Sequence, residues 1–109
     1  MATSLKILGQ SAPSATTETV LYTVPSSTST VASSLIICNR GSSTATIRVS
    51  VSAAGASTAN KDYIYYDLTI PAYDTFIATI GISLATTDKV RVYASTANVS
   101  FNLFGQENT

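Results

Sequence analysis

Residues 61–70, Lys61-Asp62-Tyr63-Ile64-Tyr65-Tyr66-Asp67-Leu68-Thr69-Ile70, alternate apolar and polar side chains over most of their length. A period of two is typical of a β-strand that buries one face. The buried face is expected to hold Ile64, Tyr66, Leu68 and Ile70, and the exposed face Tyr63, Tyr65, Asp67 and Thr69. The chain is expected to reverse directly afterwards, because Pro71-Ala72-Tyr73-Asp74 has proline at its favoured turn position.

Seven other segments carry a similar signal and are closed by turn residues. They are residues 5–8, 18–24, 30–39, 44–53, 75–84, 89–94 and 98–105. Antiparallel strands at roughly ten-residue spacing, joined by short turns, are typical of a sandwich or a closed barrel. The sequence therefore predicts an all-β fold, an antiparallel β-sandwich of about eight strands with a jelly-roll-like arrangement. An immunoglobulin-like sandwich is the near alternative, although the antibody type is excluded because Trp and a Cys pair are missing.

Local features add detail to this picture. Residues 30–39 are apolar on both faces, which predicts a central strand covered on both sides. Gly81 is expected to mark a bulge, and Cys38, which lies in an apolar run, is expected to be a buried thiol. The small residues of the segment 54–60 predict a mobile loop, and the polar tail 106–109 is expected to fray.

The composition excludes several classes of function. Six basic and six acidic residues give a formal net charge of zero, so binding to nucleic acid or to a membrane is not expected. Only 11% of the residues are charged, against about 25% in a typical soluble domain. A surface of this kind is typical of a subunit that is covered in an assembly. No apolar run has the length of a signal peptide or a membrane span, so the protein is expected to fold in the cytoplasm of the cell that makes it.

The sequence offers little for catalysis or metal binding. Histidine is absent, which removes the general base of a Ser-His-Asp triad, and the single cysteine cannot build a zinc site. The acidic residues form no close pair except Asp62 and Asp67, whose odd separation places them on opposite faces of one strand. We therefore expect no enzymatic activity, no catalytic or metal site and no cofactor.

Tyrosine and arginine form the most informative cluster. Both residue types are enriched where proteins touch one another. The expected contact surface consists of Tyr63, Tyr65, Tyr93, Arg48 and Arg91. Two other interpretations are that sugars stack on the rings, and that the tyrosines merely favour strands, with Tyr66 in the core.

The chain is expected to form one domain with an N-terminal extension. Residues 18–109 are expected to form the sandwich, and residues 1–17 a strand or arm followed by a linker. The apolar side chains of this arm, Leu5, Ile7 and Leu8, are expected to add a strand to the exposed sheet edge of a neighbour.

Several strings are similar to those of a known group of proteins. They are residues 21–25 (LYTVP), 31–41 (VASSLIICNRG), 65–67 (YYD), 70–75 (IPAYDT) and 92–105 (VYASTANVSFNLFG). Together they resemble small virion proteins of tailed bacteriophages, cyanophages included, in register over nearly the whole chain. The resemblance contains no catalytic motif.

The resemblance implies a structural component of a phage particle, made in the host cytoplasm and located in the virion. The first expectation is a capsid decoration, or cement, protein that bridges capsomers as a homotrimer and contacts the major capsid protein. One alternative is a tail, baseplate or tail-fibre-attachment component that contacts tail proteins. Another is a carbohydrate-binding module for host attachment that uses the tyrosine face.

Overall fold

The computed structural model describes residues 2–109, which fold into two layers of β-sheet. The strands are β1 (Thr3–Ser11), β2 (Thr19–Thr23), β3 (Ser29–Asn39), β4 (Ala45–Ser52), β5 (Tyr63–Ile70), β6 (Thr75–Leu84), β7 (Lys89–Ala94) and β8 (Val99–Asn108). Two short 3-10 turns, η1 (Ala53–Gly55) and η2 (Asn60–Asp62), lie between β4 and β5. The predicted strands therefore all form, with ends that differ by a few residues.

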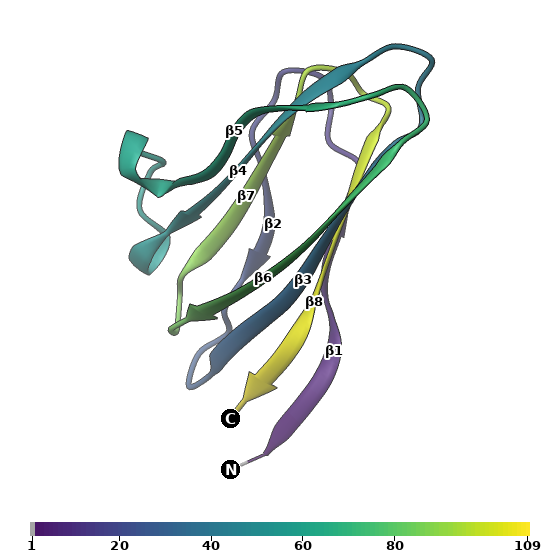
Figure 1. Cartoon of the computed structure of the whole chain (residues 1–109). Coiled ribbons are helices and arrows are strands. Elements are labelled where there is room, and N and C mark those ends of the chain that lie inside the picture. The colour runs from purple at the N-terminus through teal and green to yellow at the C-terminus, as the bar shows by residue number, and fades with distance from the viewer. Residues whose placement is uncertain (1) are drawn as a thin grey trace.

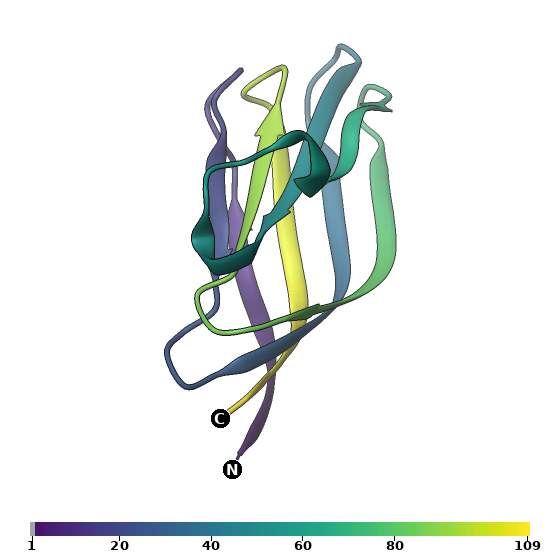
Figure 2. The same ribbon diagram turned by 90° about the vertical axis from the view of Figure 1, so that its left-hand side faces the viewer.

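Each layer is a four-stranded antiparallel sheet. Sheet A has the order β1-β8-β3-β6, and sheet B has the order β2-β7-β4-β5. Figure 1 shows the two layers side on, and Figure 2 shows the turn region of η1 and η2 in front of sheet B. The chain passes from one sheet to the other at every connection except β4–β5, and its first and last strands pair, which gives the jelly-roll arrangement that the sequence predicted.

The core fills the space between the sheets with branched aliphatic side chains and one phenylalanine. Its largest fully buried members are Phe101, Leu35, Ile37, Ile47, Ile70, Leu103, Val24, Val49, Val90, Val92 and Val99. β3 lies between β8 and β6, so its predicted central position is confirmed. The predicted cover on both faces is not seen within the chain, because the outer face of β3 is open and Val31 is 37% exposed.

A line of bulges crosses sheet A and changes which residues face the core. On β1 the register shifts between Ile7 and Gly9, and on β3 it shifts between Ala32 and Ser34. Opposite this shift, β6 has one extra residue between Thr79 and Ile82. Gly81 lies there with a φ of 55°, so the predicted bulge is confirmed. On β3 the inward residues are therefore Ala32 and then Leu35, three positions later rather than two.

β5 differs from the expected alternation because it contains two irregularities. Val49 pairs with Tyr65 and Ile47 pairs with Leu68, so two residues of β5 stand opposite one residue of β4. A second shift follows between Val49 and Ser50. As a result Tyr65 faces inward and packs against the core, while Tyr66, expected in the core, is 58% exposed. Leu68 and Ile70 face inward as predicted.

Two other local expectations are corrected. Cys38 is half-buried on the outer face of sheet A, because its neighbours Ile37 and Asn39 take the inward positions. The C-terminal residues do not fray, since β8 continues to Asn108. Beyond it, Thr109 exchanges backbone hydrogen bonds with Ala2 at 2.8 and 3.1 Å.

Candidate interaction surfaces

The outer face of sheet B carries a stacked cluster of arginine and tyrosine. The Arg48 guanidinium lies 4.3 Å from the ring centre of Tyr66 and 4.6 Å from that of Tyr93. Its Nε donates to Asp67 Oδ1 at 2.7 Å, and its Nη2 donates to Asp67 Oδ2 at 3.4 Å. The Tyr63 ring meets Tyr66 edge to face at a centroid distance of 4.9 Å. We call Arg48, Tyr63, Tyr66, Asp67 and Tyr93 the arginine–tyrosine cluster.

The bulge in β5 builds this cluster. Because Tyr66 and Asp67 together stand opposite Arg48, both side chains reach the same guanidinium. Asp67 has a φ of 54°, in the left-handed region that aspartate tolerates better than most residues. Tyr93 comes from the other side, since β7 pairs Tyr93 with Arg48.

The positive and negative charges of the cluster, on Arg48 and Asp67, balance each other. The Asp67 carboxylate raises the pKa of the Arg48 guanidinium, chiefly through its hydrogen bond. The charge of Arg48 is therefore balanced by the Asp67 carboxylate, and the guanidinium stacks on the rings of Tyr66 and Tyr93. The cluster is a preorganised aromatic patch with little net charge.

Three of the five residues predicted for the contact surface belong to this cluster, namely Arg48, Tyr63 and Tyr93. Tyr65 does not, because it faces inward and meets Phe76 edge to face at 5.5 Å. Sequence reasoning missed Tyr66, which the regular alternation assigned to the core. The available signal was Asp67, a residue type that favours the positive φ of a bulge.

Arg91, the fifth predicted residue, serves a different part of sheet B. Its Nη1 donates to Ala56 O at 2.7 Å and to Ser52 Oγ at 2.9 Å, and its Nη2 donates to Gly55 O at 3.3 Å. These bonds hold the segment 53–62 against the outer face of sheet B. Residues 54–60, which were expected to be mobile, are thus bound by Arg91 at Gly55 and Ala56. Ser52, which also accepts from Arg91, is buried.

The outer face of sheet A has the opposite character. Within the described residues, the side chains that alternate outward on β1, β8, β3 and β6 include no charged group. Six of them are apolar and lie across all four strands: Leu5, Ile7, Val31, Ile36, Ile77 and Phe104. Leu5 is 81% exposed and Ile77 is 67% exposed. We call this surface the uncharged face.

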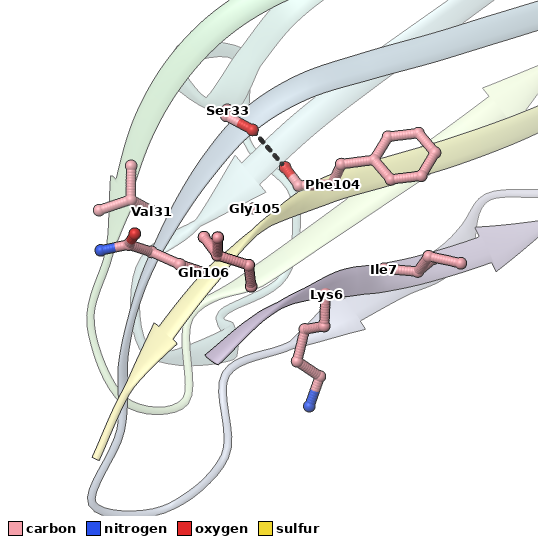
Figure 3. Close-up of a pocket in the computed structure, with 8 residues that line it drawn as sticks. Lys6, Ile7, Val31, Ser33, Phe104, Gly105 and Gln106 are labelled. Atoms are coloured by element: carbon pink, nitrogen blue, oxygen red, sulfur yellow. Dashed lines mark hydrogen bonds between the residues drawn. The ribbon is translucent and has the colours of Figure 1, made fainter. Parts of the chain in front are cut away.

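A shallow groove runs through the uncharged face where β1, β8 and β3 meet. Figure 3 shows Ile7, Phe104, Val31 and Gln106 around it, and the Ser33 hydroxyl bonded to Phe104 O at 3.2 Å. Lys6, whose ammonium bonds Glu107, lies at the edge of the groove. Gly105 also lines the groove, and a Cβ atom there would meet Val31 O at 2.1 Å. The absence of a side chain at Gly105 lets the strands approach closely.

The predicted arm is the edge strand β1 of sheet A, paired with β8 of the same chain. Leu5 and Ile7 point outward, and Leu8 packs against the core. Lys6 Nζ donates to Glu107 Oε1 at 2.8 Å, and the Tyr22 hydroxyl donates to Glu107 Oε2 at 2.5 Å. Lys6 and then Tyr22 lower the pKa of the Glu107 carboxyl, while burial and Glu107 raise the pKa of Tyr22 to about 12. This network ties β1 and β8 to β2 of the other sheet.

Residues 2–109 contain no group of three or more His, Cys, Asp or Glu side chains placed to hold a metal ion. Nor do they contain a helix with the length and apolar character needed to cross a membrane. Neither the protein-family models nor the curated proteins compared with this chain match it.

Proposed function

We propose that this chain is a structural subunit of a bacteriophage virion, a capsid decoration protein that acts by adhesion and without turnover. It is made in the host cytoplasm and binds the major capsid protein through the uncharged face. The resemblance to small phage virion proteins supports the setting, and the jelly-roll arrangement is one that viral structural proteins use.

The observation that carries the proposal is the separation of charge between the two outer faces. Arg48, Asp67, Lys61 and Arg91 lie on or beside sheet B, whereas the outward side chains of sheet A in the described chain are uncharged. The centres of protein interfaces are depleted in charged residues, because burying a charge costs its hydration. An exposed leucine and two exposed isoleucines on one face gain free energy when a partner covers them.

The test is reassembly on particles from which the protein has been removed. Purified wild-type protein is expected to bind such particles and to raise their resistance to heat. The Ile7→Lys variant places a charge in the uncharged face and is expected to lose binding. Val20→Lys is the matched control, because Val20 is 44% exposed on the edge strand of sheet B, away from the uncharged face. Equal binding by both variants would contradict the proposal.

The number of copies of this protein per particle distinguishes a location in the head from one in the tail. A decoration protein is expected at a copy number comparable to that of the major capsid protein, as measured by quantitative mass spectrometry of purified particles. A much lower number would instead place the chain in the tail, baseplate or fibre attachment.

The arginine–tyrosine cluster favours a second candidate function, carbohydrate binding for host attachment. Tyr66 offers an exposed ring, and Asp67 and Arg48 beside it can accept from and donate to sugar hydroxyls. A glycan array is expected to show binding that the Tyr66→Ala variant loses and Tyr73→Ala retains. If the wild-type protein binds no glycan on the array, carbohydrate binding is excluded as its function.

A further inference from the structure

The two sheets have four edge strands, and three of them carry features that block pairing with another chain. β1 carries Lys6 and a register shift after Ile7. β2 has only 5 residues, contains a register shift, and is soon followed by Pro25. β5 contains two shifts and Asp67. Short length, charge, proline and bulges are the usual means by which exposed edges avoid pairing.

β6 lacks these features over the half of its length from Thr75 to Thr79. Its 10 residues include no charged residue and no proline, and its pairing with β3 is regular from Thr75 to Thr79. The bulge near Gly81 affects only the far part of the strand. A long, uncharged and regular edge is a template for another strand, so a protein that remains soluble must cover it.

We infer that β6 pairs with β6 of a second copy of this chain, antiparallel about a two-fold axis at Ile77. The inference stands on the edge strand alone and does not need the proposed function. A two-fold axis matches an edge with itself, so a strand can take this role only if its sequence is self-complementary in the antiparallel direction.

The sequence of β6 has this property when the axis passes through Ile77. Ile77 then stands opposite Ile77 of the partner subunit, which places two β-branched side chains side by side on the uncharged face. Thr75 stands opposite Thr79 of the partner subunit, a pair that favours neighbouring strands. On the inner face, the large Phe76 meets the small Ala78 of the partner subunit.

The regular pairing covers Thr75 to Thr79. Tyr73 and Asp74 lie in the turn before β6, and Gly81 lies at the bulge, so these residues stand outside the paired stretch.

The pairing joins the two copies of sheet A into one continuous sheet. The two uncharged faces then form a single surface about twice as wide, with the Ile77 pair at its centre. The assembly is a dimer, so it differs from the homotrimer that the resemblance implies.

Mass measurement by light scattering with size exclusion tests the dimer. The wild-type protein is expected to have twice the monomer mass, and Ile77→Lys is expected to halve it by placing a charge at the axis. Circular dichroism checks that this variant folds, as expected for a side chain that is already 67% exposed. Val20→Lys is the control and is expected to stay dimeric. A wild-type monomer at the highest soluble concentration, a trimer, or a dimeric I77K variant would overturn the inference.

Cross-linking tests the register. In a Cys38→Ser background, the Ile77→Cys variant is expected to form an intermolecular disulfide on mild oxidation, because directly opposed residues have Cα atoms about 4.5–5.5 Å apart. Ile7→Cys, also exposed on sheet A but on the opposite edge strand, is expected to remain reduced. The absence of a disulfide in I77C, or equal cross-linking of I7C, would overturn the proposed axis. A dimeric Ile7→Lys variant that does not bind particles would separate this inference from the proposed function.

Discussion

At the scale of single residues, Asn39 shows how one buried amide fixes one end of the sandwich. Its Nδ2 lies 2.9 Å from Ser43 O, 3.1 Å from Ile70 O and 3.2 Å from Pro71 O. Its Oδ1 accepts from the Gly41 backbone N–H at 3.0 Å. The side chain is fully buried and joins the β3–β4 turn to the β5–β6 turn.

The Asn39→Ala variant is therefore expected to lower the free energy of unfolding by about 2–4 kcal/mol, because it leaves several buried backbone groups without partners. Urea denaturation measures the change. Asn102→Ala is the matched control, since Asn102 accepts a single side-chain bond, from Gln10, near the surface, and a small effect is expected. Equal losses in the two variants would show that the buried bonds do not set the stability of the turns.

Glu107 makes the stability depend on pH. The pKa of its carboxyl is lowered in the folded state from the ordinary value of 4.5, so the folded state favours the ionised form. Its contribution is fully present above pH 4.5 and is lost as the pH falls through the lower folded pKa. The advantage of the wild type over Glu107→Gln is thus expected to be constant near neutral pH and to shrink below pH 4.5. Thermal unfolding of both proteins at several pH values measures this difference, and a gap that persists into strong acid would contradict it.

At the scale of elements, the segment 53–62 depends on Arg91. Replacing Arg91 by alanine removes the donors to Ala56 O and Gly55 O, while the bond from the Ala54 backbone N–H to Asp88 Oδ1 remains. The variant is expected to be cleaved faster by trypsin after Lys61, while the sandwich remains folded. Limited proteolysis with mass spectrometry measures the rate. Arg40→Ala is the control, because Arg40 bonds Ala97 O and does not contact the segment. Unchanged cleavage in R91A would mean that η1 and η2 keep the segment ordered without Arg91.

The strands themselves could be predicted from the sequence, because alternation and turn residues mark them directly. β6 and β7 have the predicted ends. The facing of Tyr65 and Tyr66 could not be predicted, because a bulge adds one residue and reverses the alternation without changing the local composition. The same limit applies to Cys38, whose apolar neighbours occupy both faces of a central strand.

The candidate surfaces were predictable only in part for a related reason. Arg48 and Tyr93 were expected together because arginine and tyrosine are both enriched where proteins touch one another. The uncharged face was not expected, since it is assembled from strands distant in sequence, β1, β8, β3 and β6. Only the order of strands in the sheet shows that Leu5, Phe104 and Ile77 share one surface.

At the scale of the whole molecule, the first and last strands of the chain pair with each other. β1 and β8 pair along nearly their whole lengths, and the backbones of Ala2 and Thr109 exchange two hydrogen bonds. The first and last strands therefore already form an antiparallel pair that lacks only its connecting turn (Figure 1).

Joining Thr109 to Ala2 through an Asn-Gly turn is expected to stabilise the fold, because this dipeptide suits a two-residue hairpin connection. Cyclisation removes conformational freedom from the unfolded chain while leaving the folded one unchanged, so the free energy of unfolding should rise by about 2–4 kcal/mol. The control is the linear chain with the same added residues at its end. Denaturation of both forms in urea measures the gain. An unchanged stability would mean that the ends of β1 and β8 separate in solution, and amide exchange of residues 2–7 would then be fast in the linear protein and slow in the cyclic one.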